Sequence, residues 1–292
     1  MELWEPVNGI FMVPAASLPP DLGSLMKALN SPLISAVIGG MLGASFGAWA
    51  AGWIAKRNKQ YDAVTQEIRA NNLAMLLAQQ VFHLALALKV DAVKPMADAF
   101  NTAREKYIDP KPGDAIEAQN LQKISEVAPP IDMLRTCALE RITLPGIAIR
   151  AVLQIVESVG CLNRSLSKRN EFADLFMTQK FPPGMDFQHM YFGVEKNGAC
   201  HTGYMDSMKS MVRYTDEVIF FSVTLCQMLD AHGVKLRKEC KKLAWGKVTI
   251  NRFRLDSKIP EGIIPDAKAY AKWFAGYEPQ VESKKWWHLF RK

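Results

Sequence analysis

The sequence predicts a mainly α-helical protein with one N-terminal transmembrane helix that continues into a cytoplasmic multi-helix domain with at most a minor β-hairpin. Two observations support this fold class. Residues 33–55 read LISAVIGGMLGASFGAWAAGWIA and contain no charged side chain. After residue 57, apolar side chains recur at helical spacing, and segments containing Pro and Gly separate the predicted helices. The chain therefore divides into predicted parts at 1–32, 33–56, 57–110 and 111–292.

The uncharged run is long enough to cross a bilayer. A helix of this length rises by about 34 Å, and the hydrocarbon core of a bilayer is about 30 Å thick. Core helices of soluble proteins seldom stay uncharged for so long. A cleaved signal peptide fits poorly, because the run begins late and no basic segment precedes it. We therefore predict a membrane helix over residues 33–56.

The flanking charges predict the orientation of this helix. Residues 1–32 carry three acidic side chains and one lysine, whereas residues 56–59 carry three basic side chains. Basic residues concentrate on the cytoplasmic side of membrane helices, so the N-terminal tail is expected outside and the rest of the chain in the cytoplasm. The side chains expected at the membrane interface are Trp49, Trp53, Lys56, Arg57, Trp286 and Trp287.

The tail before the membrane helix contains one further helical pattern. Asp21 follows two prolines and is a suitable N-cap, and the apolar residues from Leu22 to Leu29 fall on one helical face. This pattern predicts a short helix on the outer membrane surface. An irregular linker is the alternative.

Small side chains gather on one side of the predicted membrane helix. Residues four apart share a helical face, and two neighbouring rows contain only Gly, Ala and Ser. The central members, expected to pack against another helix or to line a pore, are Gly39, Gly40, Gly43, Ala44, Gly47, Ala48 and Ala51. Small residues let helices approach closely in lipid, where van der Waals packing drives association. The rows predict assembly with further copies or with a partner, and a Gly- and Ala-rich anchor without further role is the alternative.

Helical spacing continues beyond the membrane helix as far as Lys94, and Pro95 should end the helix because it lacks an N–H donor. The segment 57–110 is either a stalk or the first helix of a bundle. Further helices are predicted at 115–127, 131–142, 144–166, 170–179 and 204–232, with irregular segments at 181–187 and 192–203. Residues 217–229 are mostly apolar but too few to span, which predicts a buried core helix. Residues 247–256 alternate weakly and predict the one strand or hairpin.

Signatures of catalysis are absent from the sequence. It has no phosphate-binding glycine loop, no paired-histidine metal motif and no nucleophile elbow. The five cysteines form no CxxC pair, which fits reduced thiols in the cytoplasm, and the five histidines are scattered. We therefore predict no catalytic residue, no metal site and no cofactor, and we do not expect an enzyme.

Basic residues outnumber acidic ones by 36 to 29, which predicts an anionic partner, either lipid headgroups or nucleic acid. The main cluster, with one aromatic ring included, consists of Lys235, Arg237, Lys238, Lys241, Lys242, Lys247, Arg252, Arg254 and Trp245. Together with Phe253, this combination suits phosphate contact with base stacking, and an ordinary solvated helix face is the alternative. The C-terminal KKWWHLFRK is typical of an interfacial membrane tail, or of a tail that docks on a neighbouring subunit.

The layout of residues 38–59, IGGMLGASFGAWAAGWIAKRNK, followed by the charged helix of residues 66–86, resembles membrane effectors of bacterial anti-phage defence. The nearest family is the channel subunit of the Hailong system, whose relatives form oligomeric membrane channels controlled by single-stranded DNA oligomers. The resemblance covers about the first 110 residues and rests on architecture. It implies a bacterial inner-membrane location and an oligonucleotide that holds the channel closed.

These observations lead to one main hypothesis. The chain is expected to be a homo-oligomeric membrane channel or pore-forming effector, gated by a nucleotide or oligonucleotide on a cytoplasmic helical sensing domain and acting by membrane depolarisation. The expected partners are further copies of the chain, the lipid bilayer, and single-stranded DNA or a nucleotide made by a partner enzyme. The alternative is a membrane-tethered interaction or scaffold protein that conducts nothing.

Overall fold

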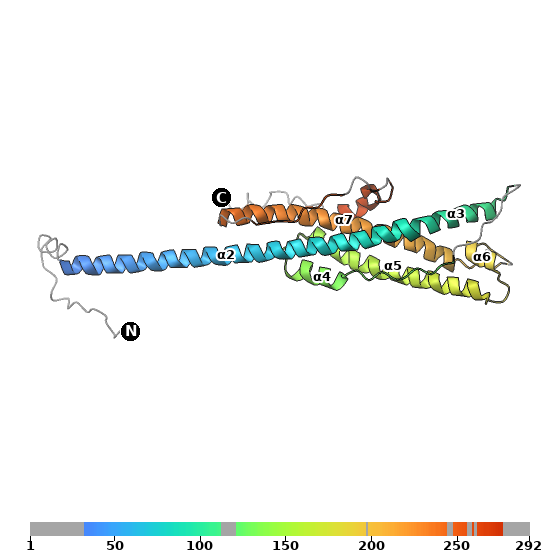
Figure 1. Ribbon diagram of the computed structural model, residues 1–292, viewed down its shortest axis with the longest axis horizontal. Coiled ribbons are helices and arrows are strands. Elements are labelled where there is room, and N and C mark those ends of the chain that lie inside the picture. The colour runs from blue at the N-terminus through green and yellow to red at the C-terminus, as the bar shows by residue number, and fades with distance from the viewer. Residues whose placement is uncertain are drawn as a thin grey trace, which may run out of the picture. The chain divides into compact units, whose positions relative to one another are not determined.

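The computed structural model describes residues 32–111, 121–196, 198–243, 248–255, 259 and 262–276, with the backbone alone for residues 32–39 and for Leu42. The predicted tail helix, Trp245, Lys247, Trp286 and Trp287 lie outside these residues. The described chain is mainly helical (Figure 1). Its elements are α2 (Pro32–Leu88), η2 (Lys89–Val93), α3 (Lys94–Ile108), α4 (Ile131–Glu140), α5 (Gly146–Thr178), α6 (Phe187–Phe192), α7 (Gly203–Leu243), η3 (Ala267–Tyr270) and α8 (Ala271–Ala275).

The chain divides into two compact units, 1–60 and 61–292. In the first unit the described element is the N-terminal part of α2. The second unit is a helical bundle, which we call the bundle throughout. Each unit is described by itself.

Pro95 does not end the helix, so the predicted stop at Lys94 is wrong. The five-residue π-helix η2 separates α2 from α3, and the Lys94 N–H donates to the Lys89 carbonyl five residues earlier. Pro95 is the second residue of α3 and directly follows this π turn, whose wider backbone leaves room for the proline ring. The wider π turn therefore absorbs the proline, and helical structure continues to Ile108.

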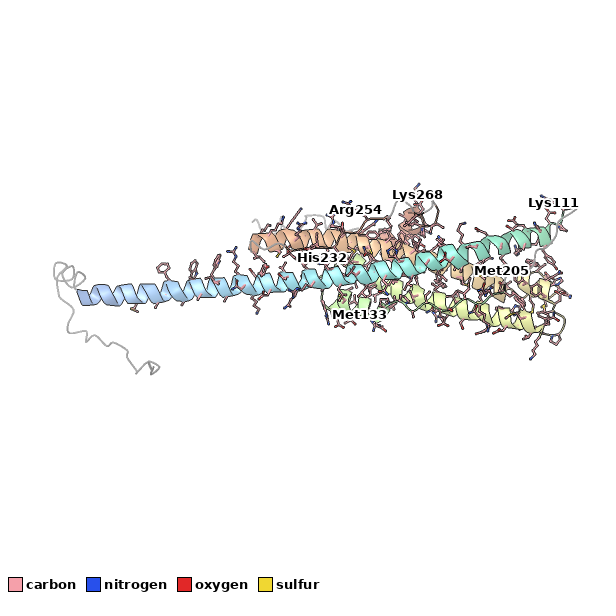
Figure 2. The ribbon with its side chains drawn as sticks, in the orientation of Figure 1. Lys111, Met133, Met205, His232, Arg254 and Lys268 are labelled. Carbon is pink, nitrogen blue, oxygen red and sulfur yellow. The ribbon has the colours of Figure 1, made fainter. Side chains whose placement is uncertain are left out.

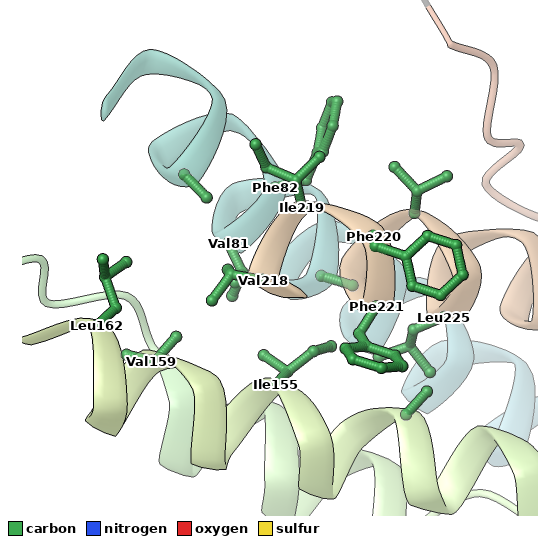
Figure 3. Close-up of a cluster of buried hydrophobic side chains, with 14 of the residues drawn as sticks. Val81, Phe82, Ile155, Val159, Leu162, Val218, Ile219, Phe220, Phe221 and Leu225 are labelled. Carbon is green, nitrogen blue, oxygen red and sulfur yellow. The ribbon is translucent and has the colours of Figure 1, made fainter. Parts of the chain in front are cut away.

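The core of the bundle lies between α2, α5 and α7. The helices α5 and α7 run antiparallel and pack along much of their length (Figure 1). Figure 3 shows side chains from the three helices meeting in one cluster: Val81, Phe82, Ile155, Val159, Leu162, Val218, Ile219, Phe220, Phe221 and Leu225. Burial of these side chains is the main stabilising contribution to the bundle.

The prediction of a buried core helix at 217–229 is confirmed, because residues 217–226 are buried on every face. The helix itself is longer than predicted and extends to Leu243. Its last turns stay helical because Leu236 and Cys240 bury against Ile68 of α2. Tertiary packing supplies this extension, which intrinsic helix propensity alone does not specify.

Two predicted helices, 144–166 and 170–179, are the single helix α5. The polar run between the two predicted ranges remains helical because its side chains have partners. Arg169 is fully buried, and its guanidinium donates to the Gln122 carbonyl. The polar residues therefore form an interface with another segment of the chain.

That segment, residues 121–130, has no helical structure, so the prediction of a helix at 115–127 is wrong for its described part. Two asparagine side chains of α5 bind its backbone. Asn170 accepts from the Ile124 N–H at 3.1 Å and donates to the Ile124 carbonyl at 2.7 Å, and Asn163 does the same with Val127 at 3.0 and 2.8 Å. Each side-chain amide bonds a backbone N–H and a backbone carbonyl, as the next strand of a sheet would. The backbone of this segment is therefore hydrogen-bonded without forming a helix.

The strand predicted at 247–256 is also absent from its described part, residues 248–255. Here too, an asparagine side chain forms the backbone hydrogen bonds that a neighbouring strand would form. Asn72 of α2 accepts from the Asn251 N–H at 2.9 Å and donates to the Thr249 carbonyl at 3.0 Å. The described residues contain no strand, only an isolated bridge between Lys196 and Ala199.

A short helix, α6, lies between the two stretches predicted to be irregular. Asp186 caps it by accepting from the His189 N–H at 3.0 Å, and Gly193 ends it in a left-handed conformation. Its last three residues are buried in the bundle. The signal was therefore present in the sequence as an Asp before, and a Gly after, six residues rich in aromatic rings.

Candidate functional site

The small-residue face of α2 is open in the single chain. A Cβ atom added at Gly40, Gly43, Gly47 or Gly52 would meet no other atom within 4 Å. Ala44, Ala48 and Ala51 of the same rows are exposed. Gly39 belongs to the part of α2 described by its backbone alone. The described members of the two rows therefore form a continuous surface of small residues without a partner in the described part of this chain.

The opposite side of the same helix segment exposes bulky apolar side chains. Met41 is 68% exposed, Phe46 is 67% exposed and Trp49 is 71% exposed. Trp53 is 54% exposed, and the Arg57 guanidinium lies 5.3 Å from the centroid of its ring. Water is a poor environment for such a surface, and a tryptophan next to a basic residue is typical of the edge of a bilayer.

Within the described residues, two helical stretches are long and apolar enough to cross a membrane, Gly43–Ile108 and Gly146–Thr178. Length and composition alone do not separate a membrane span from the core helix of a bundle. The second stretch is α5, whose apolar residues are buried against α7. Its outward side carries exposed charged residues, which are costly in lipid. They are Arg150, Glu157, Arg164 and Lys168.

The C-terminal end of α7 has a basic outward face. Lys235, Arg237, Lys238, Lys241 and Lys242 are all exposed, and we call these five residues the α7 basic face. The other side of this helix end is apolar and packs against α2 through Leu236 and Cys240. The structure therefore brings together five members of the predicted basic cluster.

The remaining members of that cluster that the structure describes, Arg252 and Arg254, lie on a different segment from the α7 basic face. Arg252 is occupied by Asp230, with its Nε 2.6 Å from Oδ1 and its second nitrogen 3.1 Å from Oδ2. Arg254 is exposed on the non-helical segment 248–255 (Figure 2). Phe253, the aromatic ring expected to stack on a base, packs edge-on against Phe82, with ring centroids 6.5 Å apart. The combination predicted for base stacking is therefore not assembled by the described residues.

Sequence reasoning missed a charged cluster at the junction of η2 and α7. Lys89 is buried, and its Nζ lies 2.6 Å from Asp216 Oδ1 and donates to the Ile263 carbonyl. The adjacent Glu217 accepts from Ser158 Oγ and from Arg213 Nε, each at 2.9 Å. A signal existed, because Lys89 is a single base in an otherwise apolar run.

Tyr270 of η3 covers this cluster. Its ring stacks on Phe220 with centroids 3.8 Å apart. Burial raises its pKa to about 12, and the nearby carboxylates of Asp216 and Glu217 add to the rise. The charges of this cluster balance one another, so it stabilises the junction and offers no free acid or base.

Three open depressions on the described surface measure about 370, 510 and 640 Å³. Each is lined by acidic as well as basic side chains, such as Glu67 with Arg69 or Asp91 with Lys123. None of the three concentrates the positive charge that an anionic nucleotide requires. Glu67 Oε1 is itself hydrogen-bonded to His232, whose Nε2 lies 3.0 Å away.

The cysteines are free thiols, and three of them are buried: Cys137, Cys226 and Cys240. Burial raises the pKa of Cys226 to about 12 and also raises that of Cys137, which makes both poor nucleophiles. No group of three potential metal ligands occurs among the described residues.

Comparison with known proteins gives no relative: no family model matches the sequence, and no match was found among curated proteins or solved structures.

Proposed function

We propose that this chain is the subunit of a homo-oligomeric membrane channel or pore-forming effector. Residues 33–56 form its single membrane span, with the N-terminus outside and residues 57–292 in the cytoplasm of a bacterial cell. The observation that carries the proposal is the open glycine face of α2, at Gly40, Gly43, Gly47 and Gly52.

Glycine in a helix interior costs about 1 kcal/mol relative to alanine, because it orders a flexible backbone and adds no side-chain contact. Four glycines on one segment therefore lower helix stability unless another contact offsets the cost. A second helix at close range supplies that contact in lipid, where small residues allow backbones to meet. A membrane helix that served only as an anchor would need no such surface.

The bulky side of the same segment supports a lipid environment. Trp49 is 71% exposed and Met41 is 68% exposed, and no described part of the chain covers them. If the small-residue rows face neighbouring copies, these large side chains face the lipid. A ring of such helices would enclose a narrow apolar passage, which can gate by excluding water.

Gating by a nucleotide or oligonucleotide and a role in anti-phage defence remain predictions. They rest on the resemblance of the N-terminal region and on the basic charge of the bundle. The described depressions do not add to them, since each mixes acids with bases.

The proposal is tested by the double variant Gly43→Leu with Gly47→Leu. The matched control, Met41→Leu with Phe46→Leu, changes the bulky side of the same segment. We expect the glycine variant to lose crosslinked oligomers in membranes and to lower depolarisation, read with a membrane-potential dye, by about tenfold or more. The control should behave as the wild type does.

Full oligomerisation and depolarisation by the glycine variant would refute the proposal. The alternative is a membrane-tethered scaffold that conducts nothing. For a scaffold, replacing residues 33–55 by a generic Leu- and Ala-rich helix should preserve activity. For a channel, that replacement should abolish it.

A further inference from the structure

The α7 basic face is unusual for this chain in having no acidic neighbours that balance it. Five bases and a single acid, Glu239, fall within residues 235–242. None of the five forms an ion pair with a carboxylate in the described part of the chain. Like charges this close repel one another, which disfavours the face in isolation and favours contact with an external anion.

Several other bases of the bundle pair with acids one turn away. Lys94 lies 2.9 Å from Asp98 on α3, Lys168 lies 2.8 Å from Glu171 on α5, and Arg213 lies 2.9 Å from Glu217 at the middle of α7. Both situations occur on α7 itself: Arg213 is paired with Glu217, whereas the five residues of the α7 basic face have no such pair among the described residues. Ordinary helix solubility therefore does not account for the α7 basic face.

The position of this face within the bundle indicates its partner. The apolar side of the same helix end packs against Ile68, with Tyr61 and Val64 beside it. Tyr61 is the first residue of the bundle and follows Ala55, the end of the uncharged run, by six residues. Six residues rise by about 9 Å in a helix and reach at most about 22 Å when extended.

An anionic membrane surface acts over a comparable distance. The headgroup layer adds about 5–8 Å on each side of the hydrocarbon core, and charge attraction extends about 8–10 Å further at physiological salt. Basic clusters close to the cytoplasmic side of a membrane helix bind anionic lipids for this reason. The α7 basic face has the charge, the exposure and the place in the chain that such binding requires.

Nucleic acid fits the same face less well. Binding of single strands depends on aromatic rings on which bases stack, as well as on charge. Phe253, the described ring expected from the sequence to stack on a base, is held against Phe82, and Tyr61 packs with the apolar side of the helix end. Arg252 is held by Asp230. The described face therefore offers charge without a stacking platform, which suits headgroup phosphates.

We propose that the α7 basic face binds the anionic lipid headgroups of the membrane in which the chain is anchored. The inference rests on the membrane span proposed above. Contact with headgroups would hold the end of α7 at the membrane surface, so that lipid charge and ionic strength control how the bundle is held there. Each basic residue removed should weaken the docking equilibrium about fivefold at low salt.

The test uses the full-length protein in vesicles of phosphatidylcholine alone or mixed with phosphatidylglycerol, both with a nitroxide quencher on the lipid headgroup. A fluorophore is attached at Glu239→Cys, after Cys161→Ser and Cys200→Ser remove the more accessible thiols. We expect quenching at least about twofold stronger in the anionic vesicles, and this difference should disappear at high salt.

The test variant replaces all five residues of the α7 basic face by Gln, and it should show the same weak quenching in both vesicles. The matched control removes five exposed charges elsewhere on the bundle and should retain the wild-type difference. It carries Gln at Lys94, Lys123, Lys168, Lys180 and Lys209.

Flotation of the same vesicles at alkaline pH reports anchoring independently. Protein that floats but is quenched equally in both vesicles would overturn the lipid inference and leave the membrane span intact. Protein that fails to float would overturn the span, and the inference with it. Binding of an oligothymidine that is lost in the five-Gln variant, combined with equal quenching in both vesicles, would assign the face to nucleic acid and would also overturn the inference.

Discussion

Residues 40–60 of α2 and the bundle use apolar side chains in opposite ways. In the bundle, the α2 residues Ala74, Met75 and Ala78 have no exposed surface, because they pack into the hydrophobic core. In residues 40–60, bulky side chains such as Phe46 remain two-thirds exposed and the glycines are open. Hydropathy alone therefore does not show whether the apolar side chains of a helix are buried by other parts of the same chain.

The comparison also separates two uses of small residues. In the bundle, Gly233 is required by close packing, since a Cβ there would lie 2.9 Å from Asn71 Nδ2. That amide group donates to the Leu229 carbonyl at 3.1 Å. In residues 40–60 a Cβ atom on any of the glycines would meet no other element of the described chain within 4 Å. In the bundle, a glycine is needed because another side chain already lies against it. In the open segment, the glycines leave space that a second helix could occupy.

The largest expected difference concerns loss of bulk. Leu225→Ala, at a fully buried position, should lower the free energy of unfolding by about 2–5 kcal/mol, because it leaves a cavity in the core. Met41→Ala, at a position that is 68% exposed, should change it by less than about 0.5 kcal/mol. Urea unfolding of detergent-solubilised protein, followed by circular dichroism, measures both. Equal losses would mean that residues 40–60 are packed within the chain after all.

A smaller difference is expected for added bulk at glycine. Gly233→Ala should destabilise the bundle by about 1–3 kcal/mol, because the Asn71 amide must move from its hydrogen bond. Gly47→Ala should raise helix stability by up to about 1 kcal/mol, because its Cβ has free space and alanine is the better helix former. The same unfolding measurement tests the pair, and a neutral Gly233→Ala would contradict the packing described for α7 and α2.

The smallest expected effect is a dependence on pH that acts on the bundle alone. The His189 N–H, the Lys196 amine and the His189 ring all bond the Asp186 carboxylate and hold its pKa well below the usual range. The carboxyl group has a pKa of about 3.9 in an unfolded chain, so this stabilisation is complete above about pH 4 and is lost as the pH falls towards the lower folded-state pKa. Residues 40–60 contain no carboxylate.

Asp186→Asn should therefore lower bundle stability modestly at pH 7, because the ion pair with Lys196 is lost although asparagine still caps the helix, and it should reduce the further loss between about pH 4 and pH 2. Thermal unfolding at a series of pH values measures the effect. An unchanged pH profile in this variant would mean that the cap does not contribute to acid sensitivity.

The helical character, the apolar α2 segment with its rows of small residues and the core position of residues 217–229 followed from the sequence. These features depend on the period and size of neighbouring side chains, and such information is local. The members of the α7 basic face were also named from the sequence, because they lie within one short segment. The extent of α7, by contrast, depends on a contact between Leu236 and α2 that no local pattern records.

The errors share one physical cause. Asn72, Asn163 and Asn170 satisfy the backbone of segments that are distant in the sequence, so these segments need no helix or strand of their own. The ion pair of Lys89 with Asp216 joins residues that are likewise far apart, and the π turn at η2 carries the helix past Pro95. The sequence by itself determined which segments are apolar and which faces are small or basic. Only the tertiary structure decided which of these surfaces are covered, because burial and backbone pairing depend on partners brought together by folding.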